Sequence, residues 1–268
     1  MALANALAIL LYLSCSVILI RLFLHKSQAV IPHLLSAEIL GLLALIFHAS
    51  DIFFTMKQLG GWDLGLFTTL TIASWLMAFL AFLFGLRTSS AHPGIVIYPL
   101  TIITLVLKES LPSEHATALT DPALEWHILL SLAAYSLFTL ATLQALVLSF
   151  QERQLRQHHV NVFFRRLPPL QTMEKGLFQL LVSGFILLSI GLITGAIFIE
   201  DLFAQHLVHK TVLSLVAWCV FATLLWGRKQ HGWRGTTAVK WTLTGFAFLV
   251  MAYLGTKLVL EFILVPAA

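Results

Sequence analysis

Long apolar runs alternate with short polar connections along the whole chain. Turn-forming residues such as Gly60-Gly61 and Pro168-Pro169 separate several of the runs. The runs are long enough, or nearly so, to cross the apolar core of a bilayer as helices, and they cover roughly residues 3–24, 34–54, 64–86, 93–108, 122–150, 174–200, 207–228 and 238–264. The pattern predicts an all-α polytopic membrane protein of about eight transmembrane helices, folded as a single helical bundle domain over residues 1–268.

The fifth run combines a clear helix start with a thin polar stripe. Asp121 can cap the first free amides, and Pro122 has no amide of its own, so the helix is expected to begin there. At helical spacing the polar or small residues fall on one side, while Leu, Ile, Val and Phe occupy the other. In a bilayer the polar side is expected to face protein and the apolar side lipid. The stripe consists of His127, Ser131, Ala134, Tyr135, Thr142, Ala145 and Ser149.

Composition supports the membrane class and narrows the chemistry. The chain is 59% hydrophobic and 10% charged, which leaves no stretch polar enough for a soluble domain. Cys15 and Cys219 both fall within predicted helices, and no Cys-x-x-Cys or haem-attachment motif is present, so neither a disulfide framework nor thiol-redox chemistry is indicated. The first run lacks a basic segment before it and is interpreted as a spanning helix rather than a cleaved signal.

The distribution of positive charge predicts the orientation, because Lys and Arg near helix ends are retained on the cytoplasmic side. Four lysines fall at one set of helix ends, namely Lys57, Lys108, Lys210 and Lys257. The other set holds Arg21, Lys26, Arg87, Arg153, Arg156, Arg165, Arg166, Lys175, Arg228, Lys229, Arg234 and Lys240. Both termini are therefore expected outside. The basic connection 151–174 matches no nucleic-acid module, so anionic lipid headgroups are its expected contact.

Histidines near the predicted outer side are the candidates for binding chemistry. His48 and His127 each lie about six residues from an outer helix end, which at roughly 1.5 Å per residue puts both about 9 Å deep. Two imidazoles at one depth could ligate a metal or a haem iron from both faces. Alternatively, each is hydrogen-bonded to Ser, Thr or carbonyl groups of neighbouring helices. Lys210 is either a snorkelling anchor or the partner of a haem propionate.

Recognisable catalytic motifs are missing from the sequence. There is no His-Glu-x-x-His, no phosphate-binding Gly-rich loop and no serine in a nucleophile elbow, so no catalytic residue is assigned. Gly184, Gly191 and Gly195 fit close helix packing of the small-xxx-small kind.

An ordered set of segments resembles the cytochrome c assembly protein family, the CcsA/HemX-type membrane haem handlers, and most of all its small YpjD-like branch. The similarity spans about residues 30 to 260. The set consists of His127 with the segment 128–135, the segment 167–174 followed by Gly184 and 191–195, Lys210, the segment 214–218, and the turn 232–235. The resemblance implies a bacterial inner-membrane protein that binds or delivers haem b at the outer face.

The chain also departs from the family at positions that handle haem. The family's tryptophan-rich outer loop should fall near 205–211, where only Lys210 matches, and the membrane histidine before the turn 232–235 falls at about Trp226. His127 therefore remains, with His48 as its expected partner and His206, His209, Lys210 and Tyr135 as further candidates. The alternative is a non-haem accessory or regulatory subunit of another inner-membrane protein, such as an ion transporter.

Overall fold

The computed structural model describes residues 2–24, 30–63, 65–86, 92–111, 116–117, 122–157, 167–198 and 205–255. These residues form eight α-helices, one π-helical turn and one pair of two-residue strands, which confirms the all-α prediction. Six of the described helices are long and apolar enough to cross a membrane. The chain is thus a multi-pass membrane protein. It divides into an N-terminal unit, residues 1–119 and 161–168, and a C-terminal unit, residues 120–160 and 169–268.

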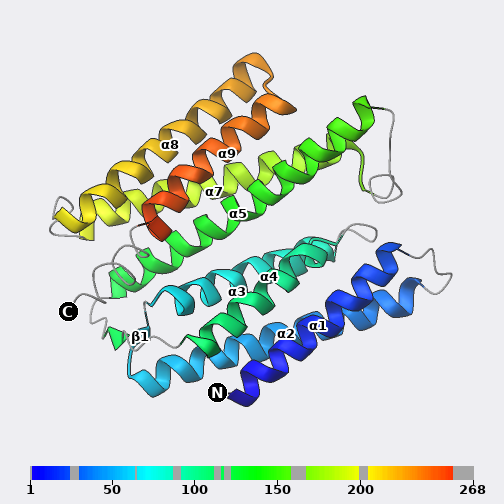
Figure 1. The fold of residues 1–268 in the computed structure, drawn as a ribbon. Coiled ribbons are helices and arrows are strands. Elements are labelled where there is room, and N and C mark those ends of the chain that lie inside the picture. The colour runs from blue at the N-terminus through cyan, green and yellow to red at the C-terminus, as the bar shows by residue number, and fades with distance from the viewer. Residues whose placement is uncertain are drawn as a thin grey trace. The chain divides into compact units, whose positions relative to one another are not determined.

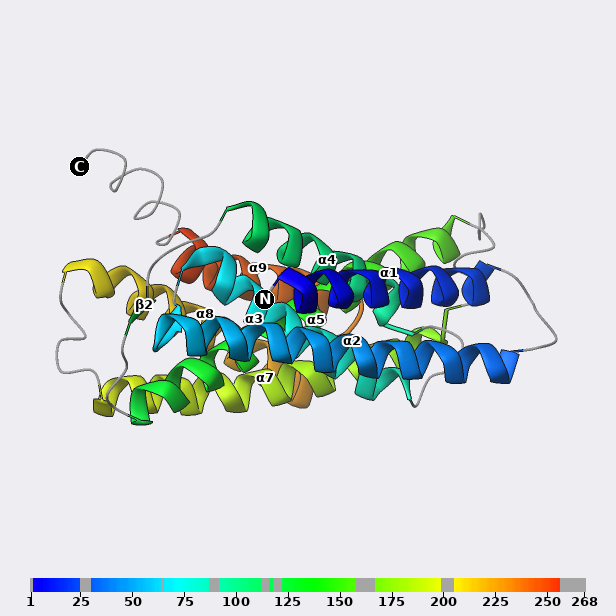
Figure 2. The same ribbon diagram turned by 90° about the horizontal axis from the view of Figure 1, so that it is seen from below.

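The N-terminal unit contains four helices, α1 (Ala2–Leu24), α2 (Val30–Leu59), α3 (Leu66–Gly85) and α4 (Gly94–Ser110). Helix α1 lies along α2 and also packs against α4, while α3 packs against α4 and α2 (Figures 1 and 2). The rings of Tyr12 and Tyr98 lie 5.2 Å apart between α1 and α4, and both side chains are fully buried. A β-bridge joins β1 (Trp62–Asp63) to β2 (Ala116–Thr117) in antiparallel register.

The C-terminal unit is built from α5 (Pro122–Arg156), α7 (Leu170–Phe198), α8 (Gln205–His231) and α9 (Thr236–Val250), which continues into a π-helical turn, Met251–Gly255. Helix α5 packs along α7 and α9, and α8 packs against α7 and α9 (Figure 1). Phe138 of α5 and Phe221 of α8 stack at the centre with ring centroids 4.0 Å apart. Lipid tails are as apolar as these side chains, so close van der Waals packing and interhelical hydrogen bonds hold the helices together.

Several helices extend beyond the predicted apolar runs. Helix α2 has 30 residues, or about 45 Å at roughly 1.5 Å per residue, whereas the predicted run ended at residue 54. Helices α5 and α8 also end later than predicted. Hydropathy marks only the apolar part of a helix, whereas backbone hydrogen bonding carries the helix on through polar residues. Helices α4 and α9 are the short ones, with 17 and 15 residues, and the predicted stretch 256–264 lies outside the described residues.

Candidate cofactor site in the C-terminal unit

His127 lies in the second turn of α5, against α7. Its Nδ1 atom is 3.0 Å from the hydroxyl oxygen of Thr194, and that hydroxyl donates its proton to the Gly191 carbonyl at 3.0 Å. Because the hydroxyl proton is already used, the favoured arrangement has the Nδ1–H of His127 donating to Thr194. The lone pair of the neutral ring then lies on Nε2, which is the atom that a metal would bind.

Small residues on α7 make room for the polar stripe of α5. A Cβ placed on Gly195 would lie 3.0 Å from Cε1 of His127, and one on Gly191 would lie 3.4 Å from the Ser131 hydroxyl oxygen. Further along, Gly184 meets the ring of Phe138, with the nearest ring atoms 3.2 Å from the position of such a Cβ. The predicted close packing at these three glycines is therefore present.

Tyr135 lies on the same stripe as His127, but it contacts α8 and α9 rather than α7. Its hydroxyl donates to the Leu249 carbonyl of α9 at 3.2 Å and also meets the hydroxyl of Ser214 on α8. Its ring lies 5.8 Å from that of Tyr253. These contacts tie α5 to α8 and α9, whereas His127 is held by α7.

The remaining candidates of this unit lie at the start of α8. The side chain of His209 is exposed, and that of Lys210 is half-buried and engaged in a contact. His206 belongs to the first turn of α8, but its side chain lies outside those that the structure describes. His206, His209 and Lys210 thus occupy two successive turns of one helix.

His48 lies in the N-terminal unit and is fully buried between helices. Its Nδ1 atom is 3.4 Å from the Tyr12 hydroxyl, a long hydrogen bond, and the two rings meet edge to face at 5.9 Å. Nε2 has no hydrogen-bond partner among the described residues, although the Thr71 backbone lies beside the ring. Since His127 belongs to the other unit and each unit is described by itself, the predicted pairing of the two histidines stays a prediction.

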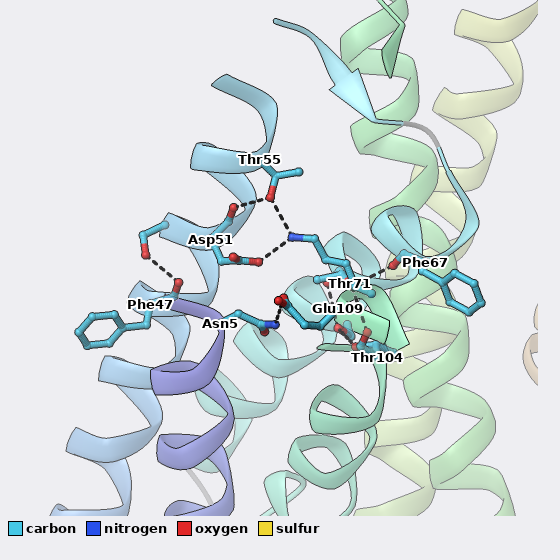
Figure 3. A network of polar contacts seen from close by, with 11 residues as sticks. Asn5, Phe47, Asp51, Thr55, Phe67, Thr71, Thr104 and Glu109 are labelled. Carbon is cyan, nitrogen blue, oxygen red and sulfur yellow. Dashed lines mark hydrogen bonds and ion pairs between the residues drawn. The ribbon is translucent and has the colours of Figure 1, made fainter. Parts of the chain in front are cut away.

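A polar network that the sequence analysis missed lies near His48. The Lys108 ammonium is 2.6 Å from an oxygen of Asp51 and donates to the Thr55 hydroxyl at 2.9 Å. In Figure 3, Asp51 and Thr55 from α2 face α4, and Asn5 from α1 reaches Glu109, to which it donates at 2.9 Å. The distribution of positive charge predicts only that Lys108 lies at the outer helix ends. A search for opposite charges on that side would have suggested the pair.

Among the described residues, no three His, Cys, Asp or Glu side chains gather in a way that could hold a metal ion. A haem iron makes a smaller demand, because the protein supplies only one or two axial ligands. The Nε2 atom of His127 fits that smaller demand as one such ligand.

The chain is similar in sequence to several known proteins. The family model described as "Cytochrome C assembly protein" matches residues 3–264. The chain is 36% identical to "Inner membrane protein YpjD" of Escherichia coli (strain K12) over 169 residues, which is 63% of this chain and 64% of YpjD. It is 22% identical to "Protein HemX" of Brevibacillus brevis, covering 80% of this chain and 82% of HemX.

A shorter stretch resembles "Cytochrome c biogenesis protein CcsA" of Trichodesmium erythraeum (strain IMS101), with 33% identity over 35% of this chain and 27% of CcsA. No solved structure matches the chain.

Proposed function

Because the chain belongs to the cytochrome C assembly protein family, we propose that it binds haem b non-covalently and delivers it at the outer face of the bacterial inner membrane, with His127 as an axial ligand. Cytochromes c carry haem, so their assembly needs a membrane protein that holds the cofactor in a defined position. The proposal concerns binding and transfer, and it assigns no catalytic residue to this chain.

The single observation that supports it most is the hydrogen-bond relay behind His127. Histidines that ligate a metal usually donate their other ring N–H to an oxygen, which fixes the tautomer and makes the ligating nitrogen more basic. In the favoured arrangement Thr194 accepts from Nδ1–H and donates to the Gly191 carbonyl, so Nε2 keeps its lone pair. When bound, the haem would supply the iron chemistry, and this chain would supply a ligand and its orientation.

The other candidates have distinct roles in this proposal. Lys210 would pair with a haem propionate, because an ammonium and a carboxylate attract strongly where water is scarce. His209 and His206 are candidates for a second axial ligand from α8. His48 is the alternative second ligand from the N-terminal unit, and Tyr135 would support α5 through its contacts with α8 and α9.

The visible spectrum of the protein purified from haem-replete cells tests the proposal. We expect a Soret band that His127→Ala removes or shifts, while the matched control His231→Ala, an exposed histidine at the far end of α8, leaves it unchanged. Thr194→Val removes the acceptor of Nδ1–H and should weaken haem affinity by roughly tenfold or more. A protein without a Soret band, or a band unaffected by His127→Ala, would refute the assignment.

A second set of spectra identifies the second ligand. A bis-histidine iron is six-coordinate in both redox states, so losing one histidine gives a five-coordinate or water-bound spectrum. His48→Ala, His206→Ala and His209→Ala are each compared with the parent protein, and the variant that loses six-coordination names the ligand. If none does, His127 acts without a second histidine from this set.

The alternative function is that of an accessory or regulatory subunit without haem, serving another inner-membrane protein such as an ion transporter. The departures from the family pattern at residues 205–211 and at Trp226 favour it. A stoichiometric membrane partner that copurifies with haem-free protein would support this alternative. A monodisperse protein that carries haem would contradict it.

A further inference from the structure

An open apolar groove of about 350 Å³ runs along the outside of α8. Six of its lining residues recur every three or four positions and so form one stripe of the helix, and Trp241 of α9 closes one end. The lining consists of Val212, Leu215, Val216, Cys219, Val220, Thr223 and Trp241. The stripe runs from Val212 to Thr223, a rise of about 16 Å at roughly 1.5 Å per residue, which suits an extended hydrocarbon chain.

The end of the groove at Trp241 is fixed by the turn between α8 and α9. Gly232 and Gly235 adopt positive φ angles of 64° and 57°, which lets the turn reverse tightly. Trp233 in the turn stacks on Trp241 with ring centroids 5.5 Å apart, and it sits so close to Gly227 that a Cβ there would meet the ring at 2.3 Å. Aromatic rings of this kind are typical of the membrane interface.

Two basic residues neighbour the tryptophans of this end in sequence. Arg234 in the turn and Lys240, the neighbour of Trp241, are both exposed. Two nearby carboxylates are already paired, since Glu174 binds Arg228 at 2.6 Å and Glu152 binds Arg156 at 2.7 Å. Two exposed cations thus adjoin, in sequence, the stacked tryptophans at this end of the groove, and we call this end the rim.

We propose that this groove is a binding site for one anionic glycerophospholipid of the phosphatidylglycerol class. An acyl chain lies in the groove along α8, Trp241 marks the level of the glycerol backbone, and the phosphate lies between Arg234 and Lys240. Basic pockets between helices at the membrane surface bind anionic lipid headgroups in this way. The site is independent of the proposed haem site.

The charge of the rim decides between a lipid and a partner helix. A helix docked in the groove would continue past Trp241 into the basic rim and leave its two charges without counter-ions. An anionic lipid fits both the apolar groove and the basic rim. Its acyl chain would lie in the groove, and its negatively charged headgroup would lie at the rim.

Native mass spectrometry of the delipidated full-length protein tests the proposal. Phosphatidylglycerol and phosphatidylcholine with identical acyl chains are titrated separately. At about fivefold per basic residue near the surface, two residues should give phosphatidylglycerol roughly 30-fold tighter one-to-one binding. The double variant Arg234→Gln/Lys240→Gln should bring the two lipids to similar affinity. The matched control Lys175→Gln, an exposed lysine of α7 in the same unit, should keep the preference.

Cys219 offers a second readout, because it is exposed in the groove while Cys15 is buried. Bound phosphatidylglycerol should slow the reaction of the Cys219 thiol with a maleimide several-fold, and the same amount of phosphatidylcholine should not. Val216→Phe fills the groove and should weaken one-to-one lipid binding, with a monodisperse elution profile as the check on folding.

Three outcomes would overturn the proposal. These are equal binding of both lipids by the parent protein, an effect of Lys175→Gln as large as that of the double variant, and unchanged phosphatidylglycerol binding by Val216→Phe. A dimer that Val216→Phe dissociates would assign the groove to a second copy of the chain instead. None of these results depends on whether the protein carries haem.

Discussion

Asp51 and Lys108 illustrate how a charged residue is accommodated inside an apolar helical unit. The Asp51 side chain is 3% exposed and that of Lys108 is 11% exposed, and the Thr55 hydroxyl accepts a second hydrogen bond from the ammonium. A buried charge without its partner is far more costly than the pair, because water no longer solvates it. The pair therefore holds α2 and α4 together only while both members are present.

We expect Asp51→Asn and Lys108→Met each to lower the free energy of unfolding by about 3–5 kcal/mol, because each leaves one buried charge unpaired. The double variant should lose much less than the sum of the two. Chemical unfolding in detergent, followed by tryptophan fluorescence, measures all three. Strict additivity would show that the two charges do not interact across α2 and α4.

His92 is a second buried polar residue, located just before α4. The Gly94 amide donates to its Nδ1 atom at 2.9 Å, so the ring is held in the neutral form, and a Cβ on Gly85 would collide with it at 1.7 Å. Burial lowers the pKa of His92 from 6.5 to about 4. Between these two values the unfolded chain binds a proton that the folded chain does not.

Stability should therefore fall as the pH is lowered from about 6.5 to about 4, and the contribution of His92 to this loss should not exceed about 3 kcal/mol. His92→Gln retains an acceptor for the Gly94 amide but does not titrate. We expect the variant to show a flatter stability profile across this window when unfolding is followed at several pH values. Parallel profiles for the parent and the variant would contradict the assignment.

At the scale of elements, the contact between α5 and α7 positions the candidate haem ligand. His127, Ser131 and Phe138 face Gly195, Gly191 and Gly184 in order, so three positions of α5 each meet a glycine of α7. The helices approach closely because glycine has no side chain, and the same approach brings Thr194 within hydrogen-bonding distance of His127. Helix packing and ligand geometry are thus set by the same residues.

Gly195→Ala should displace the His127 ring, because the added Cβ would lie 3.0 Å from Cε1. We expect a loss of stability of about 1–3 kcal/mol, together with a weakened Soret band if His127 ligates haem. Gly176→Ala in the same helix is the matched control, since its nearest neighbour, the Gln144 amide nitrogen, is 3.8 Å away. Thermal unfolding and the visible spectrum of both variants measure the difference, and identical behaviour would contradict the predicted clash.

At the scale of the molecule, the clustering of positive charge predicts which helix ends face the cytoplasm. In the N-terminal unit the contacts of Asn5 with Glu109 and of Asp51 with Lys108 bring together helix ends that the charge distribution had assigned to one side. These contacts agree with the predicted alternation of helix directions within the unit. The prediction of which ends face the cytoplasm depends on the charge distribution.

Cysteine labelling tests this orientation. In a Cys219→Ser background, Lys57→Cys should react with a membrane-impermeant maleimide added to intact cells, and Lys229→Cys should react only after the membrane is opened. Lys57 and Lys229 are both exposed, so a difference in labelling would report the side of the membrane rather than burial of the side chain. The reverse pattern would place both termini inside.

The sequence by itself determined the class of the protein, the order and approximate limits of its helices, and the family resemblance. These follow from local properties, since an apolar run of about twenty residues has few stable forms other than a spanning helix. It also indicated His127 and the three glycines of α7, because helical spacing places residues on faces.

Only the tertiary structure decided which faces meet. Asp51 and Lys108 pair across 57 positions of sequence, and Tyr135 reaches the Leu249 carbonyl across 114. The relay from His127 likewise ends at Gly191 of another helix. Periodicity orients a side chain about its own helix axis, but the partner across the contact depends on how helices distant in sequence pack together.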